Sequence, residues 1–109
     1  LAPPVVHRWP FPDSNSVQLS WRIYTNENNN CEETQLKTRC NYTTVFGKGY
    51  KGKNATAETT IPKGTNLITK NLSITNLSPY TRYNCYGIAE NRQGQSEDSM
   101  EVFVQTLEE

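Results

Sequence analysis

Three cysteines and one histidine are the side chains in this sequence best suited to metal binding or nucleophilic chemistry. They are Cys31, Cys40, Cys85 and His7. No C-x-x-C pair is present to begin the tetrahedral ligation of zinc, so a zinc site built from these four residues is disfavoured. His7 stands beside prolines in a segment that favours an edge strand, so a surface or packing role outweighs a catalytic one.

The carboxylates and glycines also lack a catalytic arrangement. Asp13, Asp98 and the glutamates fall in turns and tails, without the fixed spacing of a glycosidase pair or a metal site. No glycine-rich phosphate loop follows a strand-like segment. We therefore expect a protein that is not an enzyme and that uses no metal or other cofactor.

Length and charge narrow the class of protein further. The chain has 109 residues, which suits a single domain over residues 1–109. Eleven lysines and arginines balance eleven aspartates and glutamates, so no net field would attract nucleic acid or an anionic membrane. No apolar run approaches the roughly 18 residues of a membrane span, so this segment is not expected to insert into a membrane.

The elements that would position functional side chains are strands. Apolar and polar residues alternate with a period of two in several segments, and no segment of ten or more residues carries a helical stripe. The start of the chain predicts a short edge strand around residues 5–9, because Pro10 and Pro12 interrupt pairing. Residues 47–54 predict a hairpin or loop, and residues 55–66 an irregular stretch with an edge strand. The sequence thus predicts an all-β domain of six or seven strands; the alternating segments are residues 16–24, 33–46, 66–74, 76–91 and 99–106.

The same alternation assigns side chains to an inward and an outward face. Within residues 33–46 the outward face would carry Lys37, Arg39 and Asn41. The inward positions are Val17, Leu19, Trp21, Ile23, Leu36, Thr38, Cys40, Tyr42, Leu72, Ile74, Tyr83, Cys85, Gly87, Ala89, Val102 and Val104.

Several motifs occur together along the chain. A tryptophan closes the alternating stretch VQLSW, L-x-P-x-T-x-Y follows late in the chain, and A-x-N-x-x-G comes shortly after it. Together these motifs resemble the fibronectin type III domain; the residues concerned are Trp21, Leu77, Pro79, Thr81, Tyr83, Ala89, Asn91, Gly94 and Thr106.

The resemblance implies a specific architecture. It is an immunoglobulin-like antiparallel β-sandwich of seven strands, with strands A, B and E in one sheet and C, C′, F and G in the other. Trp21, Leu77 and Tyr83 would belong to the structural core, with Tyr83 at the tyrosine corner. Residues 1–4 and 107–109 look like the ends of linkers to neighbouring modules, so the chain is expected to be one module of a longer ectodomain.

The cysteines depart from this resemblance, because most fibronectin type III domains have none. If strand C begins near Thr34 and strand F ends near Asn91, antiparallel pairing sets Cys40 opposite Cys85, with both facing the core. Directly opposite Cα atoms lie about 4.5 to 5.5 Å apart, which a disulfide accepts. Cys31 would be left unpaired, or would be the alternative partner of Cys40 if the chain between them folds back. Two buried free thiols are the other interpretation.

Four N-x-[ST] sequons provide acceptors for N-linked glycans, at Asn41, Asn54, Asn71 and Asn76. Asn76 is the weakest acceptor, because Pro79 directly follows its triplet and stiffens the backbone there. Together with the cysteines, the sequons indicate a secreted or cell-surface glycoprotein.

Lysines are concentrated in and after the predicted hairpin. Lys48, Lys51 and Lys53, together with Lys63 and the outward Lys37 and Arg39, would form a basic patch for a sulfated glycan or an acidic partner. The other interpretation is a solubilising surface that also protects an exposed sheet edge.

These observations predict a non-catalytic extracellular module of a cell-surface receptor, acting as a spacer and protein-recognition surface in adhesion or signalling. Its partners would be a protein ligand or neighbouring fibronectin modules, with a sulfated glycan as a further partner. The cysteine placement and the C-terminal TLEE look like the modules of receptor-type tyrosine phosphatases, so the parent would be a single-pass membrane protein. One alternative is a cytokine-receptor-like ligand-binding module, although SEDSMEV lacks the W-S-x-W-S signature. Another is a polysaccharide-binding accessory domain of a secreted hydrolase.

Overall fold

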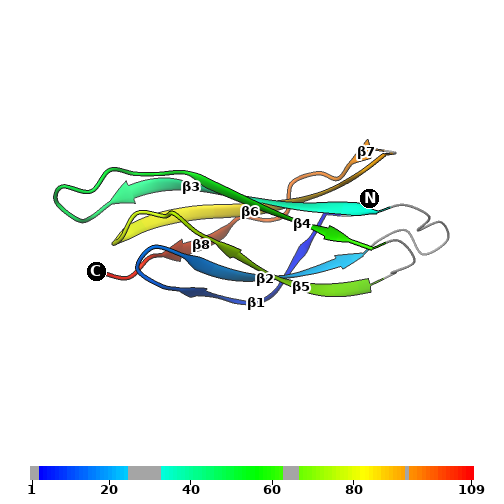
Figure 1. Cartoon of the computed structure of the whole chain (residues 1–109), viewed down its shortest axis with the longest axis horizontal. Coiled ribbons are helices and arrows are strands. Elements are labelled where there is room, and N and C mark those ends of the chain that lie inside the picture. Colours follow the sequence, from blue (N-terminus) through cyan, green and yellow to red (C-terminus); the bar gives the residue numbers. More distant parts are fainter. Residues whose placement is uncertain (1–2, 25–32, 63–66, 93) are drawn as a thin grey trace.

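The computed structural model describes residues 3–24, 33–62, 67–92 and 94–109, and these residues form two packed antiparallel sheets (Figure 1). The described residues contain no helix, and hence none long and apolar enough to cross a membrane. The strands are β1 (Val5–Pro12), β2 (Val17–Tyr24), β3 (Thr34–Val45), β4 (Ala55–Ile61), β5 (Leu67–Ile74), β6 (Thr81–Asn91), β7 (Gly94–Gln95) and β8 (Val102–Gln105).

The strand order confirms the predicted sandwich. One sheet has the order β1-β2-β5, and the other has the order β4-β3-β6-β7, with β8 also paired to β6. Every paired strand runs antiparallel to its neighbour. The three-stranded sheet corresponds to the implied strands A, B and E, and the five-stranded sheet to C′, C, F and G.

The described residues form eight strands where seven were expected, because the last strand is divided into β7 and β8. Between these two pieces, the Ser96 and Ser99 N–H groups donate to the carbonyls of Ala89 and Gly87. The hydroxyls of the same serines accept hydrogen bonds from the Ala89 and Gly87 N–H groups, each at 2.8 to 2.9 Å. The serine side chains therefore satisfy groups of β6 that a continuous partner strand would otherwise pair.

The first strand lies at a sheet edge, as predicted, but the prediction that it is short was wrong. It runs from Val5 to Pro12, and it pairs with β2 at both ends and at Arg8. Its register shifts twice, between Val6 and Arg8 and between Arg8 and Phe11. Such irregularities let an edge strand continue past Pro10, which has no N–H to donate.

The segment that the sequence marked as irregular is more regular than expected. β4 follows β3 without a register shift from the Cys40–Ala55 pair to the Thr34–Ile61 pair, and it forms the edge of its sheet. The predicted loop before it, residues 47–54, joins β3 to β4 as a hairpin.

The core lies between the two sheets and is centred on Trp21 and Tyr83, which have no exposed surface. A Cβ atom on Gly87 would lie 3.2 Å from the Trp21 ring, so the glycine lets β6 pass close to the indole. The Tyr83 hydroxyl accepts a hydrogen bond from the Ser78 N–H at 2.8 Å, closing the corner before β6. Leu77, at the same corner, is also buried.

Tyr42 does not join this core, although the alternation assigned it to the inward face. Its side chain is 45% exposed, whereas the neighbouring inward residues Thr38 and Cys40 are buried. The Tyr42 ring occupies the space that a side chain on Gly52 would need, within the loop after β3. β3 therefore extends beyond the part of the sandwich that the second sheet covers.

Cys40 and Cys85 form a disulfide between β3 and β6. They are directly opposite each other in the strand register, with Cα atoms 4.1 Å apart, and both are fully buried. The structure therefore has the expected Cys40–Cys85 bridge in place of two buried free thiols. Cys31 lies outside the described residues.

Candidate functional site

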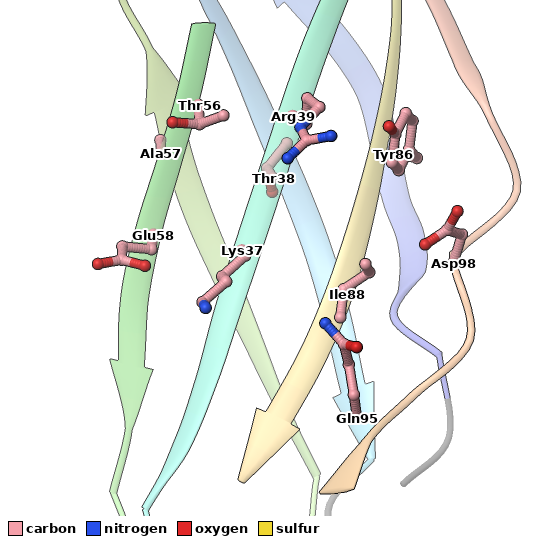
Figure 2. A pocket seen from close by; sticks show the side chains of 10 residues that line it. All are labelled: Lys37, Thr38, Arg39, Thr56, Ala57, Glu58, Tyr86, Ile88, Gln95 and Asp98. Atoms are coloured by element: carbon pink, nitrogen blue, oxygen red, sulfur yellow. The ribbon is translucent and has the colours of Figure 1, made fainter.

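The outward side of the five-stranded sheet carries an extensive set of charged, polar and aromatic side chains. Strand register places residues of β4, β3 and β6 in rows across this side: Thr56, Arg39 and Tyr86 form one row, and Glu58, Lys37 and Ile88 form the next (Figure 2). Gln95 and Asp98, from the β7–β8 region, close one margin. These residues surround a hollow of about 680 Å³, and we refer to them as the candidate face.

Charges of both signs lie close together on the candidate face. The Lys37 ammonium is 3.2 Å from a Glu90 carboxylate oxygen, and this is the only ion pair found among the described residues. Both side chains are more than one-third exposed, so the pair contributes at most about 1 kcal/mol to stability. Gln95 donates a hydrogen bond to the same oxygen of Glu90 at 3.4 Å. The pair therefore orients side chains at the surface more than it stabilises the fold.

The centre of the candidate face is less polar than its margins. Tyr86 and Ile88 point outward from β6 and are half-exposed, between the charged side chains of β3 and the Gln95–Asp98 margin. Sequence reasoning missed both residues, because it followed only the inward members of residues 76–91. The signal was present, since the outward positions between Cys85 and Ala89 hold a large aromatic residue and a β-branched residue.

The described residues include no cluster suited to a metal ion. No group of three or more histidine, cysteine, aspartate or glutamate side chains is placed to hold a metal ion there. His7 lies in β1, on the other sheet, where its Nδ1 atom accepts a hydrogen bond from the Arg22 guanidinium at 2.9 Å. What the candidate face offers chemically is a hollow lined by charged, polar and apolar side chains.

Two of the four sequon asparagines lie beside each other at one end of the candidate face. The β3–β4 register ends at the Cys40–Ala55 pair. Asn41 follows Cys40, and Asn54 precedes Ala55, so both lie just beyond this last pair. Both line a small hollow of about 240 Å³. Asn54 is exposed, and its Oδ1 atom accepts a hydrogen bond from the Tyr42 N–H at 2.9 Å, while Asn41 is half-buried.

The other two sequon asparagines lie elsewhere. Asn71 is exposed on β5, on the outward side of the three-stranded sheet. Asn76 is exposed in the turn before the tyrosine corner, where its φ angle is +62°. A glycan on Asn71 would leave the candidate face free, whereas one on Asn41 or Asn54 would border it.

We expect that a single molecule carries a glycan on Asn41 or on Asn54 but not on both. Side chains on directly opposite strand positions lie only about 5 Å apart, which leaves no room for two branched sugars at one strand end. Peptide mapping and intact mass of the protein secreted from a glycosylating host would measure this. Thr56→Ala removes the Asn54 sequon without changing Asn54 and should raise occupancy at Asn41.

Ser73→Ala is the matched control, because it removes the Asn71 sequon from the opposite sheet. It should leave the occupancies of Asn41 and Asn54 unchanged. A major species with glycans on both asparagines would show that the expected exclusion is wrong.

The structure divides the predicted basic patch between two places. Lys37 and Arg39 belong to the candidate face, while Lys48, Lys51 and Lys53 lie on the loop between β3 and β4. All five side chains are exposed. Lys63, the remaining member, lies outside the described residues.

Comparisons with known proteins give matches at the level of structure. No family model matches the chain, and no curated protein matches it. A solved myokine structure matches with a TM-score of 0.64 and 19% identity, covering 97% of this chain and 97% of that one. The FN5 domain of Drosophila Lar matches with a TM-score of 0.54 and 19% identity, covering 99% and 100% of the two chains. The fibronectin type III domain of human KIAA0970 protein matches with a TM-score of 0.54 and 19% identity, covering 98% of this chain and 72% of that one.

Identities of this size carry information about the fold alone. The matched structures cover nearly the whole of this chain, and the two sheets have the strand order that the sequence resemblance implied. The chain therefore has the fibronectin type III fold.

Proposed function

We propose that this domain is a non-catalytic extracellular module that binds a protein partner through the candidate face. The observation that carries the proposal is the layout of that face: half-exposed Tyr86 and Ile88 lie at its centre, and charged side chains lie around them. Protein interfaces have this layout, with aromatic and aliphatic anchors inside a polar rim. Domains with the fibronectin type III fold commonly mediate protein–protein interactions.

The extracellular assignment is supported by the chemistry of the chain. A disulfide between Cys40 and Cys85 is typical of proteins that fold in an oxidising compartment. Three sequon asparagines, Asn54, Asn71 and Asn76, are exposed, which is the condition for carrying a glycan on a secreted protein.

We further propose a single-pass cell-surface receptor as the parent, with a receptor-type tyrosine phosphatase as the favoured class. The module would act there as spacer and recognition surface in adhesion or signalling, beside neighbouring fibronectin modules. The placement of Cys40 in β3 and of Cys85 two residues after Tyr83 supports this class, because the resemblance rested on those positions. A cytokine-receptor-like module is the alternative, and the missing W-S-x-W-S signature counts against it.

A panel of purified cell-surface ectodomains tests the recognition proposal. The domain would be displayed as a pentamer to raise its avidity, and each ectodomain that binds would then be measured against the monomer. We expect Tyr86→Ala to weaken binding by about thirtyfold, because truncating an aromatic anchor at the centre of an interface costs about 2 kcal/mol. Ile88→Ala should weaken the same interaction.

Gln18→Ala and Thr69→Ala are the matched controls, because both residues are exposed on the outward side of the three-stranded sheet. They should leave the affinity unchanged. If every interaction found depended on Gln18 or Thr69 and not on Tyr86, or if no ectodomain bound, the proposal for the candidate face would be wrong.

A further inference from the structure

The loop between β3 and β4, residues 46–54, has an unusual concentration of free cations; we call it the hairpin loop. Lys48, Lys51 and Lys53 are exposed, and none of them pairs with a carboxylate among the described residues. They differ in this respect from Lys37, whose charge is partly satisfied by Glu90. Unpaired cations on one short loop create a local positive potential even in a chain with no net charge.

Aromatic rings lie within and beside the same loop. The side chains of Phe46 and Tyr50 are 41% and 39% exposed. A Cβ atom on Gly47 would overlap the Cδ2–Cε2 edge of the Tyr50 ring, so this ring packs against the glycine backbone. Both rings therefore offer apolar aromatic surface to solvent, on which the apolar side of a sugar can stack.

A further cation and a further ring extend this cluster. The Phe46 and Tyr80 ring centroids are 5.5 Å apart, and the Arg82 guanidinium lies 5.4 Å from the Phe46 centroid. The backbone holds the pair together, because the Phe46 N–H donates to the Tyr80 carbonyl at 2.9 Å. Arg82 was not part of the predicted basic patch, since it comes from β6, far from the hairpin loop in sequence.

The hairpin loop is fixed to the body of the domain. The Ser78 hydroxyl donates to the Lys51 carbonyl, and the Tyr83 hydroxyl donates to the Lys53 carbonyl at 2.8 Å. Tyr83 is fully buried, so the second of these bonds ties the loop to the core. A ligand would therefore meet lysines on a backbone that is already ordered, which lowers the entropic cost of binding.

We propose that the hairpin loop, with Phe46, Tyr50 and Arg82, is a binding site for a sulfated glycan. Sulfate groups would pair with the ammonium groups of Lys48, Lys51 and Lys53, and sugar rings would stack on the exposed aromatic faces. This site lies outside the candidate face, so the inference does not rest on the proposed protein partner.

Two negative charges at the C-terminus set the direction in which the glycan would lie on the hairpin loop. Glu108 and Glu109 are exposed and follow Leu107, whose carbonyl accepts a hydrogen bond from the Tyr80 N–H. The hairpin loop and the C-terminus thus lie at the same end of the domain (Figure 1). The glutamates would repel an anion from the Tyr80 side, so the glycan is expected to follow the lysines.

The arrangement favours a glycan over an anionic membrane surface. Membrane-binding segments bury protruding apolar side chains among the lipids. The ring of Tyr50 instead packs against Gly47, and the ring of Tyr42 packs against Gly52. Rings held against the loop backbone in this way do not protrude for insertion among lipids.

Chromatography and titration on immobilised heparin test the proposal. We expect the intact domain to bind at low salt and to be released as salt rises, because exposed charges are screened. The combined variant Lys48→Gln, Lys51→Gln, Lys53→Gln should bind about tenfold more weakly or worse, since three exposed pairs at about 0.5 kcal/mol each are lost. Tyr50→Ser keeps every charge and should also weaken binding.

The matched control removes three cations from the opposite sheet, with Arg8→Gln, Arg22→Gln and Lys70→Gln combined. It has the same net charge as the lysine variant and should keep the intact affinity, and melting curves would confirm that all variants fold. Equal weakening by the two triple variants would overturn the site, as would an intact domain that does not bind heparin. Equal binding to desulfated heparin, phosphatidylserine vesicles or polyglutamate would overturn the assignment to a sulfated glycan, and an unchanged Tyr50→Ser affinity would overturn the stacking.

Discussion

Replacing Cys40 and Cys85 together with alanine is expected to lower the free energy of unfolding by about 4 kcal/mol. The bridge joins residues 45 positions apart. Closing a loop of that length lowers the conformational entropy of the unfolded chain, and this raises the free energy of unfolding by about 4 kcal/mol. Both side chains are fully buried, so the double variant also leaves packing defects in the core. Because small domains have unfolding free energies of about 5 to 15 kcal/mol, the loss would bring this domain close to unfolding at body temperature.

Urea denaturation at equilibrium measures the effect. The comparison is best made in a Cys31→Ser background, so that no other thiol can form a bridge in either protein. Reduction of the intact domain removes the same constraint but keeps both sulfur atoms, so it should lower the free energy of unfolding somewhat less than the double variant does. A shift below about 1 kcal/mol in both measurements would mean that the bridge does not limit the unfolded chain as the loop length predicts.

Trp21→Ala is the second change for which a large loss is expected, of about 4 kcal/mol. The indole has no exposed surface, and it fills the space between the sheets at the point where Gly87 lets β6 approach. Removing it leaves a cavity that the surrounding strands cannot close without breaking their register. Urea denaturation measures the loss, and the change in slope would report any loosening of the native state.

Trp21→Phe should cost much less than Trp21→Ala. The indole Nε1–H has no hydrogen-bond partner among the described residues, so a phenylalanine leaves no partner unsatisfied. Gln18→Ala, an exposed change on the same strand, should alter stability by less than about 0.5 kcal/mol. If Trp21→Phe and Trp21→Ala were equally destabilising, the loss would not come from the volume of the ring.

The sequence predicted the strands best where one side of a strand is buried. In β2 and β6 the inward residues Trp21 and Tyr83 alternate with polar ones. The pairing of Cys40 with Cys85 followed from placing the alternating strands β3 and β6 antiparallel. The prediction was weakest for β4, where burial alternates only between half-buried and exposed until Ile61. An edge strand that buries so few side chains shows little alternation of apolar residues in its sequence. Its hydrogen-bonded register with β3 is what identifies it as a strand.

The candidate sites were harder to predict than the fold, because they depend on which strands become neighbours. Arg82 and Phe46 are far apart in sequence and meet only because β3 and β6 pair. Likewise, the row of Glu58, Lys37 and Ile88 exists only in the assembled sheet. The failed assignment of Tyr42 has a related cause: alternation states which way a side chain points, but not whether a second sheet covers it.

The two serines that divide the last strand affect the behaviour of the domain at high concentration. A long, flat strand at a sheet edge presents unpaired N–H and C=O groups, to which a strand of another molecule can add. Here the outermost pieces are only two and four residues long, and the Ser96 and Ser99 hydroxyls already occupy the N–H groups of Ala89 and Gly87. This side of the sheet therefore offers no continuous template for strand addition, and we expect it to resist edge-to-edge aggregation.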